Sequence, residues 1–141
     1  MLLDLQPKGN KLSVWIVDDN RSNLPRIICA LAANSESVSN IDYALLPEAA
    51  LPLDIKVDHT KGDSADDLMN SQCHRDLIEL SIQRVMDLAT SIGALGERGR
   101  VSEKHVAGLL EEGIQTGRLD RSRIRLKDSK SQTLLGERPD V

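Results

Sequence analysis

The sequence predicts one domain of the α/β or α+β class. A small, partly parallel sheet is expected to begin with a β-α-β unit, and a predominantly helical C-terminal half is expected to pack on it. Strand-like and helix-like apolar patterns alternate over residues 12–46, a short alternating strand pattern follows, and helical patterns dominate after residue 60. The 141 residues, of which 40% are hydrophobic, suffice for a single sizeable core.

The first strand is predicted over residues 12–18. Four apolar residues stand in succession at 14–17, which is typical of a strand that is buried on both faces. We therefore expect Trp15 to be mostly buried on the sheet.

A helix is predicted over residues 23–34 and a second strand over 41–46. Apolar residues from Leu24 to Leu31 recur at the spacing of one helix face, after a polar turn that can cap the helix. Strand, helix and strand together occupy about 35 residues, which is the length of a β-α-β unit, so the two strands are expected to be parallel.

The remaining elements are a strand and two helices. Residues 53–58 alternate between apolar and charged side chains, as an edge strand does. Helices are predicted over 72–93 and 102–116, each ending near glycines. Residues 1–126 are thus expected to form the globular domain, and residues 127–141 a loose C-terminal tail.

Two adjacent acids follow the first strand in the stretch WIVDDN. This stretch resembles the first strand of the receiver domains of bacterial response regulators. The resemblance implies that Asp18 and Asp19 would hold Mg²⁺, with Asp58 as the residue that accepts a phosphoryl group. Carboxylate oxygens are suitable ligands for this hard cation, which offsets phosphate charge.

The resemblance covers about ten residues, and the later strands depart from the family's pattern. Asp58 is not followed by the Met-Pro and Asp-Gly residues that family members carry, and Lys104 precedes His105 where the family has a proline. A degenerate receiver-like domain that binds Mg²⁺ and phosphate at Asp18 and Asp19 is therefore kept as an alternative. The preferred interpretation is that these acids end a strand and begin a turn.

A second candidate site is the basic segment 118–130. Five of its cations are candidates for binding an anion or a nucleic acid: Arg118, Arg121, Arg123, Arg125 and Lys127. From residue 121 onward they alternate with Ile124 and Leu126, so we expect the apolar side to pack against the domain. The cations would then face outward or toward the acidic segment 54–67, and nucleic-acid binding is the less favoured alternative.

Several classes of function lack their sequence signals. The chain has one Trp, one Tyr and no Phe, so it lacks the aromatic platforms on which single-stranded nucleic acids stack. Its three histidines and two cysteines do not occur at metal-ligand spacings, and no phosphate-binding glycine loop or nucleophile motif is present. We therefore expect no catalytic residue, no metal and no cofactor.

The location expected from the sequence is the cytoplasm. No apolar run is long enough to cross a membrane, the N-terminus does not read as a signal peptide, and two cysteines do not suggest a disulfide scaffold. The function we expect is that of a non-catalytic accessory or regulatory protein of bacterial type. It would act through protein–protein contacts, as a homodimer, because the apolar stripe on 72–93 is wider than one buried helix face.

Overall fold

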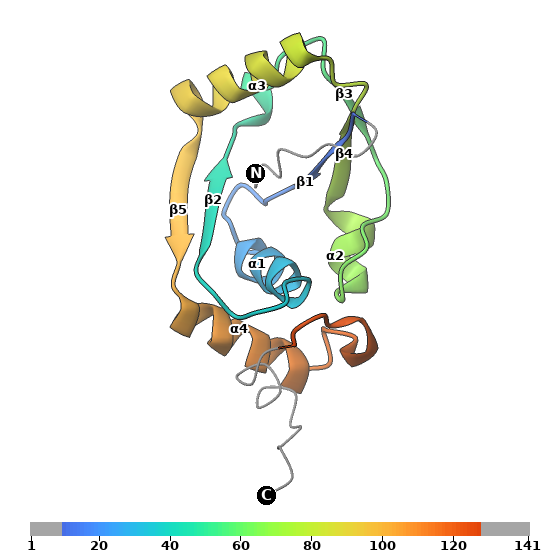
Figure 1. The fold of residues 1–141 in the computed structure, drawn as a ribbon, viewed down its shortest axis with the longest axis vertical. Coiled ribbons are helices and arrows are strands. Elements are labelled where there is room, and N and C mark those ends of the chain that lie inside the picture. Colours follow the sequence, from blue (N-terminus) through green and yellow to red (C-terminus); the bar gives the residue numbers. More distant parts are fainter. Residues whose placement is uncertain (1–9, 128–141) are drawn as a thin grey trace, which may run out of the picture. The chain divides into compact units, whose positions relative to one another are not determined.

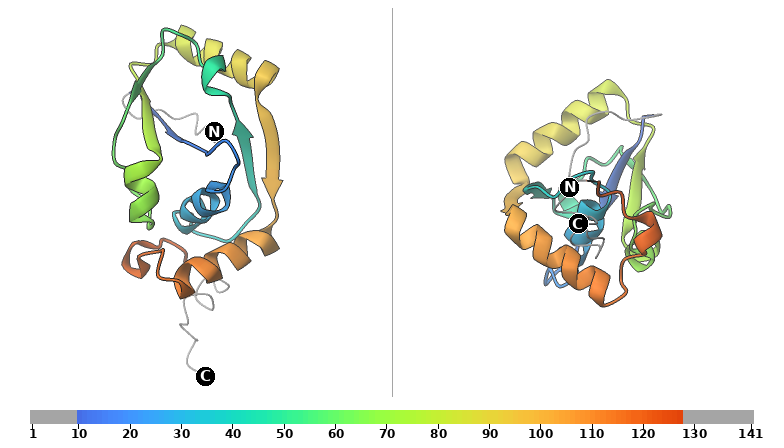
Figure 2. Two further views of the ribbon diagram at one scale, coloured as in Figure 1. Left: turned by 180° about the vertical axis from the view of Figure 1, so that it is seen from behind. Right: turned by 60° about the horizontal axis from the view of Figure 1, so that its bottom comes forward.

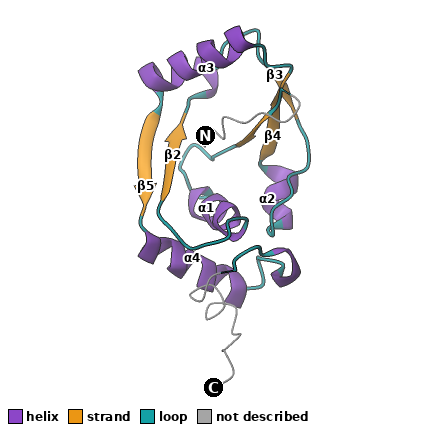
Figure 3. Cartoon of the chain, viewed as in Figure 1, coloured by secondary structure: helices purple, strands orange, loops and turns teal. Residues whose placement is uncertain are grey.

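A computed structural model of the protein describes residues 10–127. Within this range the chain forms four α-helices and two small antiparallel sheets, so the α+β class is confirmed (Figures 1 and 3). The described residues divide into two compact units. The first comprises residues 10–16, 42–61 and 74–100, and the second comprises 17–41, 62–73 and 101–127.

The first unit is built around a three-stranded sheet. Its strands are β1 (Leu12–Trp15), β4 (His74–Ile78) and β3 (Lys56–Asp58), with β4 in the centre. β4 pairs antiparallel to both neighbours, and Leu77 lies opposite Leu12 on one side and Val57 on the other. β3 lies at the edge of the sheet, as predicted, but it covers only residues 56–58 of the predicted strand 53–58.

Helix α3 (Ile82–Leu95) belongs to the same unit and begins where Ser81 accepts a hydrogen bond from the backbone N–H of Arg84. Leu88 and Ile92 on one face of α3 are buried in a core that also contains Leu12 and Leu77. This core therefore joins α3 to β1 and β4.

A second sheet consists of β2 (Ile41–Leu45) and β5 (Glu97–Val101). The two arrows run in opposite directions in Figure 1. The prediction that strands 12–18 and 41–46 are parallel partners is therefore wrong: β1 pairs with β4 and β2 with β5. Both of these partners come from the second half of the chain: β4 lies within the predicted helix 72–93, and β5 lies between the two predicted helices.

The predicted helix over 72–93 is also wrong in its first half. The short helix α2 (Asp67–Gln72) ends there, β4 follows, and α3 begins only at Ile82. Leu77, Ile78 and Ile82 fit a helical spacing, but a break lies between them, since Glu79 has a left-handed φ of 54°. Pairing with β1 and β3 decides the local structure.

Trp15 is half-buried, as are Ile16 and Val17, so β1 is not buried on both faces as the sequence predicted. β1 is four residues long and alternates, with Leu12 and Val14 in the core and Ser13 exposed. The indole of Trp15 packs edge-on against the ring of His74, with the two ring centroids 5.0 Å apart.

In the second unit, helix α1 (Leu24–Ala33) packs against helix α4 (Glu103–Gln115), and the views in Figures 1 and 2 agree on this arrangement. These helices confirm the predictions for 23–34 and 102–116. Their contact is lined by Cys29, Ala32 and Ala33 on α1 and by Val106 and Leu110 on α4. The small side chains of α1 allow the helices to approach closely.

The end of the described chain packs onto this unit. A 3₁₀ turn at Arg121–Arg123 is followed by irregular backbone, not by a strand. Leu126 is buried in the core, and the backbone N–H of Arg125 donates to the carbonyl of Ala33 at the end of α1. The predicted packing of the Ile124 and Leu126 side is therefore confirmed. Of the predicted tail 127–141, only Lys127 lies within the described residues, and the single domain over 1–126 stays a prediction.

Candidate functional site

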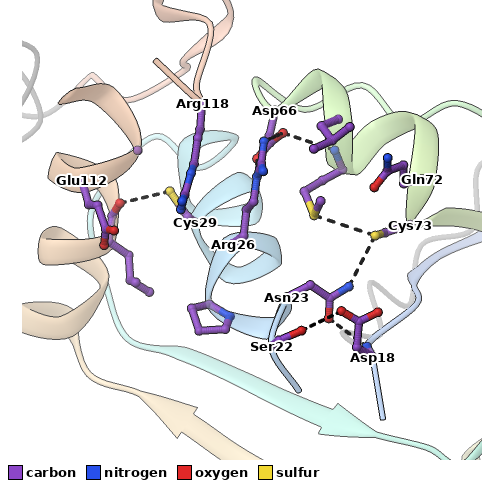
Figure 4. A pocket seen from close by; sticks show the side chains of 15 residues that line it. Asp18, Ser22, Asn23, Arg26, Cys29, Asp66, Gln72, Cys73, Glu112 and Arg118 are labelled. Carbon is purple, nitrogen blue, oxygen red and sulfur yellow. Dashed lines mark hydrogen bonds and ion pairs between the residues drawn. The ribbon is translucent and has the colours of Figure 1, made fainter. Parts of the chain in front are cut away.

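The second unit contains a pocket of about 460 Å³, shown in Figure 4. Its walls come from the start of α1, from α2 and the loop before it, from α4, and from the residues just after α4. The lining residues are Asp18, Ser22, Asn23, Pro25, Arg26, Cys29, Asp66, Leu68, Met69, Gln72, Cys73, Leu109, Glu112, Gly113 and Arg118. This volume lies within the range of small-molecule sites.

One wall is the turn that precedes α1. The backbone N–H of Asp18 donates to Oδ1 of Asn23 at 2.8 Å, and the Ser22 hydroxyl donates to Oδ2 of Asp18 at 2.8 Å. The amide of Asn23 also donates to Sγ of Cys73 at 3.5 Å. The side chains of Asn23 and Ser22 therefore hold this wall in place, with Asp18 at its edge.

An ion pair between Arg26 and Asp66 forms the back of the pocket. Nε of Arg26 donates to Oδ2 of Asp66 at 2.6 Å, and one terminal guanidinium nitrogen donates to Oδ1 at 3.0 Å. Oδ1 also accepts from the backbone N–H of Met69, so Asp66 caps helix α2 as well. The Asp66 side chain is 1% exposed and that of Arg26 is 24% exposed.

A buried polar pair supports the loop that carries Asp66. Oδ1 of Asn70 accepts from both the backbone N–H and the hydroxyl of Ser64, and the Asn70 amide donates back to the Ser64 carbonyl. Both side chains are fully buried. Because their hydrogen bonds satisfy these groups, Ser64 and Asn70 fix the loop to the helix α2 that follows it.

Both cysteines of the chain line the pocket, and both are free thiols. Sγ of Cys29 donates to the carbonyl of Leu109 at 3.2 Å. Burial, reinforced by the negative charges of Asp66 and Glu112, raises the pKa of Cys29 to about 12. At neutral pH this group is a thiol, which is a poor nucleophile.

Glu112 and Arg118 stand at the open side of the pocket, and both side chains are exposed. In Figure 4 the side chain of Arg118 extends toward Cys29, and Glu112 projects from α4 beside it. Neither forms an ion pair with any residue in the part of the chain that the structure describes. Their hydrogen-bonding groups are therefore open to a ligand.

The predicted acidic site is divided between the two units. Asp18 lines the pocket and Asp19 is exposed in the same turn, whereas Asp58 ends the edge strand β3 of the first unit. The antiparallel sheets also lack the adjoining parallel strand ends on which the receiver resemblance relies. Over residues 10–127, no group of three or more His, Cys, Asp or Glu side chains is arranged to hold a metal ion.

The predicted basic row is mostly occupied by ion pairs within the second unit. Arg123 donates to Asp67 at 2.8 Å and to Asp63 at 3.2 Å, and Arg125 donates to Asp63 at 3.4 Å. Nζ of Lys127 lies 3.6 Å from a carboxylate oxygen of Glu36. The hydrogen bonds raise the pKa of the Arg123 guanidinium, with Asp67 as the main cause. Internal pairing of this row is what we expected for Arg123 and Arg125.

Two cations of the predicted basic row, Arg118 and Arg121, form no ion pair with the described residues. Arg118 lines the pocket, and the side chain of Arg121 is exposed. The pocket itself was not predicted from the sequence, because Arg26 and Asp66 lie 40 positions apart and belong to no motif.

No described helix is at once long and apolar enough to cross a membrane. No protein-family model, curated protein or solved structure matches this chain.

Proposed function

We propose that this protein is a non-catalytic accessory or regulatory protein of the cytoplasm that acts through protein–protein contacts as a homodimer. The observation that carries the proposal is an exposed apolar face on helix α3 of the first unit. The side chain of Ile82 is 82% exposed and that of Met86 is 58% exposed. Large apolar side chains side by side on one helix face are typical of a contact surface.

The exposed face is distinct from the buried face of the same helix. Four exposed residues share one side of α3, because they are spaced by four, three and four positions along the helix. They are Ile82, Met86, Ala89 and Gly93. Leu88 and Ile92, one turn apart on the neighbouring side, are buried in the core of the unit. The wide apolar stripe expected from the sequence is thus only partly covered within its own unit.

The other sides of α3 carry different contacts. Nε of Arg84 donates to Oδ2 of Asp54 at 3.4 Å, on a side of the helix away from Ile82. We call Ile82, Met86, Ala89 and Gly93 the α3 surface.

A second copy of the chain is the partner that the α3 surface fits. If a twofold axis passes between residues 87 and 88, two antiparallel α3 helices place Ile82 opposite Gly93 of the other copy. Met86 then lies opposite Ala89. Each large side chain meets a small one, which allows close helix packing, and the surface is complementary to itself, as a twofold contact requires.

The polar groups of both units support a non-catalytic role. In the first unit the hydroxyl of Thr60 donates to Asp76 at 2.8 Å and lies 3.2 Å from Nδ1 of His74. That nitrogen is also 2.9 Å from the backbone carbonyl of Thr60, which can only accept, so it is placed to donate a proton and not to remove one from the hydroxyl. Ser13 likewise donates to Asp76, at 3.3 Å. In the second unit Cys29 is a protonated thiol. Free, buried cysteines are also consistent with the reducing cytoplasm.

Charged substitutions in the α3 surface test the proposal. We expect Met86→Glu and Met86→Lys each to give a monomer, since two like charges would lie close to the axis. A mixture of the two variants should restore the dimer. The matched control is Ala94→Glu, which places the same charge at an exposed position on another side of α3.

Size-exclusion chromatography with light scattering provides the measurement. A dimer that persists in Met86→Glu, or an Ala94→Glu variant that dissociates equally, would contradict the proposed surface. Circular dichroism of each variant shows that α3 remains folded.

A further inference from the structure

Some charged groups that line the pocket of the second unit are bonded to other residues, and others are not. Both carboxylate oxygens of Asp66 are occupied by Arg26 and by the N–H of Met69. In contrast, the Glu112 carboxylate and the Arg118 guanidinium have no ion-pair partner among the described residues. One anion and one cation are therefore available at the same opening.

These two opposite charges lie at the same end of the pocket. Both act on the thiol of Cys29, where Glu112 raises the pKa and Arg118 lowers it. Both also line the pocket, and Figure 4 shows their side chains beside Cys29. A ligand at this end would meet a carboxylate and a guanidinium together.

The charges of the lining disfavour a simple anion. Asp18, Asp66 and Glu112 contribute three negative charges, against two positive charges from Arg26 and Arg118. An inorganic anion would bind Arg118 but would face Glu112 without a compensating charge. A ligand that carries both charges satisfies both groups.

The rest of the lining is part polar and part apolar. Ser22, Asn23 and Gln72 are polar, whereas the apolar walls are formed by Pro25, Leu68, Met69, Cys73 and Leu109. A ligand with an apolar side chain would bury that side chain here, and the flexible thioether of Met69 adapts to its shape.

We propose that this pocket binds a free α-amino acid with an apolar side chain. Its carboxylate pairs with Arg118, its ammonium group pairs with Glu112, and its side chain packs against the apolar walls. The guanidinium of Arg26, which Asp66 does not use fully, provides further donors for the carboxylate. This inference is independent of the proposed dimer, because the α3 surface belongs to the first unit and the pocket to the second.

Isothermal titration calorimetry of the full chain with L-leucine tests the ligand class. Three probes separate the contributions of its groups: isocaproate lacks the ammonium group, isoamylamine lacks the carboxylate, and inorganic phosphate is a simple anion. We expect L-leucine to bind about tenfold or more tightly than each probe, because each lost charged pair removes a strong hydrogen bond. Equal binding of phosphate, or no binding of L-leucine at millimolar concentration, would overturn the proposal.

Two variants assign the roles. Arg118→Ala should weaken L-leucine and isocaproate alike, whereas Glu112→Gln should weaken L-leucine but not isocaproate, which loses only a repulsive charge. The matched controls are Arg121→Ala and Glu111→Gln, which alter exposed neighbours of the same charge outside the pocket. If the controls weaken L-leucine as much as the pocket variants do, the assignment of the ligand to Arg118 and Glu112 is wrong.

Discussion

The guanidinium of Arg26 donates two hydrogen bonds to the almost fully buried carboxylate of Asp66, at 2.6 and 3.0 Å. The pair connects helix α1 to the first residues of helix α2. Asp66 also caps α2, so one carboxylate serves both contacts. The start of α2 therefore depends on a residue 40 positions earlier in the chain.

Arg26→Met should be one of the more damaging single substitutions in the second unit. It leaves the carboxylate of Asp66 buried with only the Met69 N–H as a hydrogen-bond donor to its oxygens, and loss of one partner of a buried pair costs about 3–5 kcal/mol. Urea unfolding measures the change in the free energy of unfolding.

The matched control for this substitution is Arg125→Met. Arg125 also pairs with an aspartate, Asp63, but both side chains of that pair are largely exposed. We expect it to cost less than about 1 kcal/mol. Equal losses for the two variants would show that the Arg26–Asp66 pair is solvated like a surface pair.

Two glycines of helix α4 should respond oppositely to alanine. A Cβ on Gly113 would lie 2.9 Å from Sγ of Cys29 and 3.0 Å from Leu119, so Gly113→Ala should destabilise the protein by about 1–3 kcal/mol. A Cβ on Gly108 would meet nothing within 4 Å, and Gly108→Ala should stabilise by about 0.4–1 kcal/mol. Thermal unfolding of the two variants measures both effects, and equal signs would contradict the close contact of α1 with α4.

Cys29 should make stability decrease at alkaline pH. Its pKa is about 12 in the folded protein, against an ordinary value of 9.0. Below pH 9.0 the thiol is protonated in both states and its contribution is constant. Between these values only the unfolded chain releases the proton, so the free energy of unfolding falls by about 1.4 kcal/mol per pH unit.

The Cys29→Ala variant isolates this effect, because it lacks the thiol but keeps the other titrating groups. Urea unfolding is measured below pH 9.0 and one unit or more above it. The wild-type protein should lose more stability than Cys29→Ala across this interval. Parallel losses in the two proteins would mean that Cys29 ionises as readily in the folded state as in the unfolded state.

Helices with a single apolar face could be predicted from the sequence. α1 and α4 lie where periodicity and the caps indicated, because each buries one stripe against the other. The packing of Leu126 and the pairing of Arg123 and Arg125 with acidic residues also followed from alternation. These features depend on residue spacing within one segment.

Strand pairing could not be predicted in the same way. β4 reads as helix in isolation and becomes a strand because β1 and β3 supply its hydrogen bonds on both sides. The pocket has the same limitation, since Arg26 and Asp66 meet only when α1 and α2 are in place. No pattern within one segment of the sequence indicates a contact between residues that lie so far apart along the chain.

The central claim, that the protein associates with itself through the α3 surface, is tested most directly by sedimentation equilibrium of the wild-type chain over micromolar concentrations. For the wild type and for Ala94→Glu, we expect the mass to approach twice the 15.5 kDa of one chain and to fall on dilution. For Met86→Glu, we expect the mass of one chain at every concentration. A constant mass of 15.5 kDa for the wild-type chain at every concentration would contradict the claim.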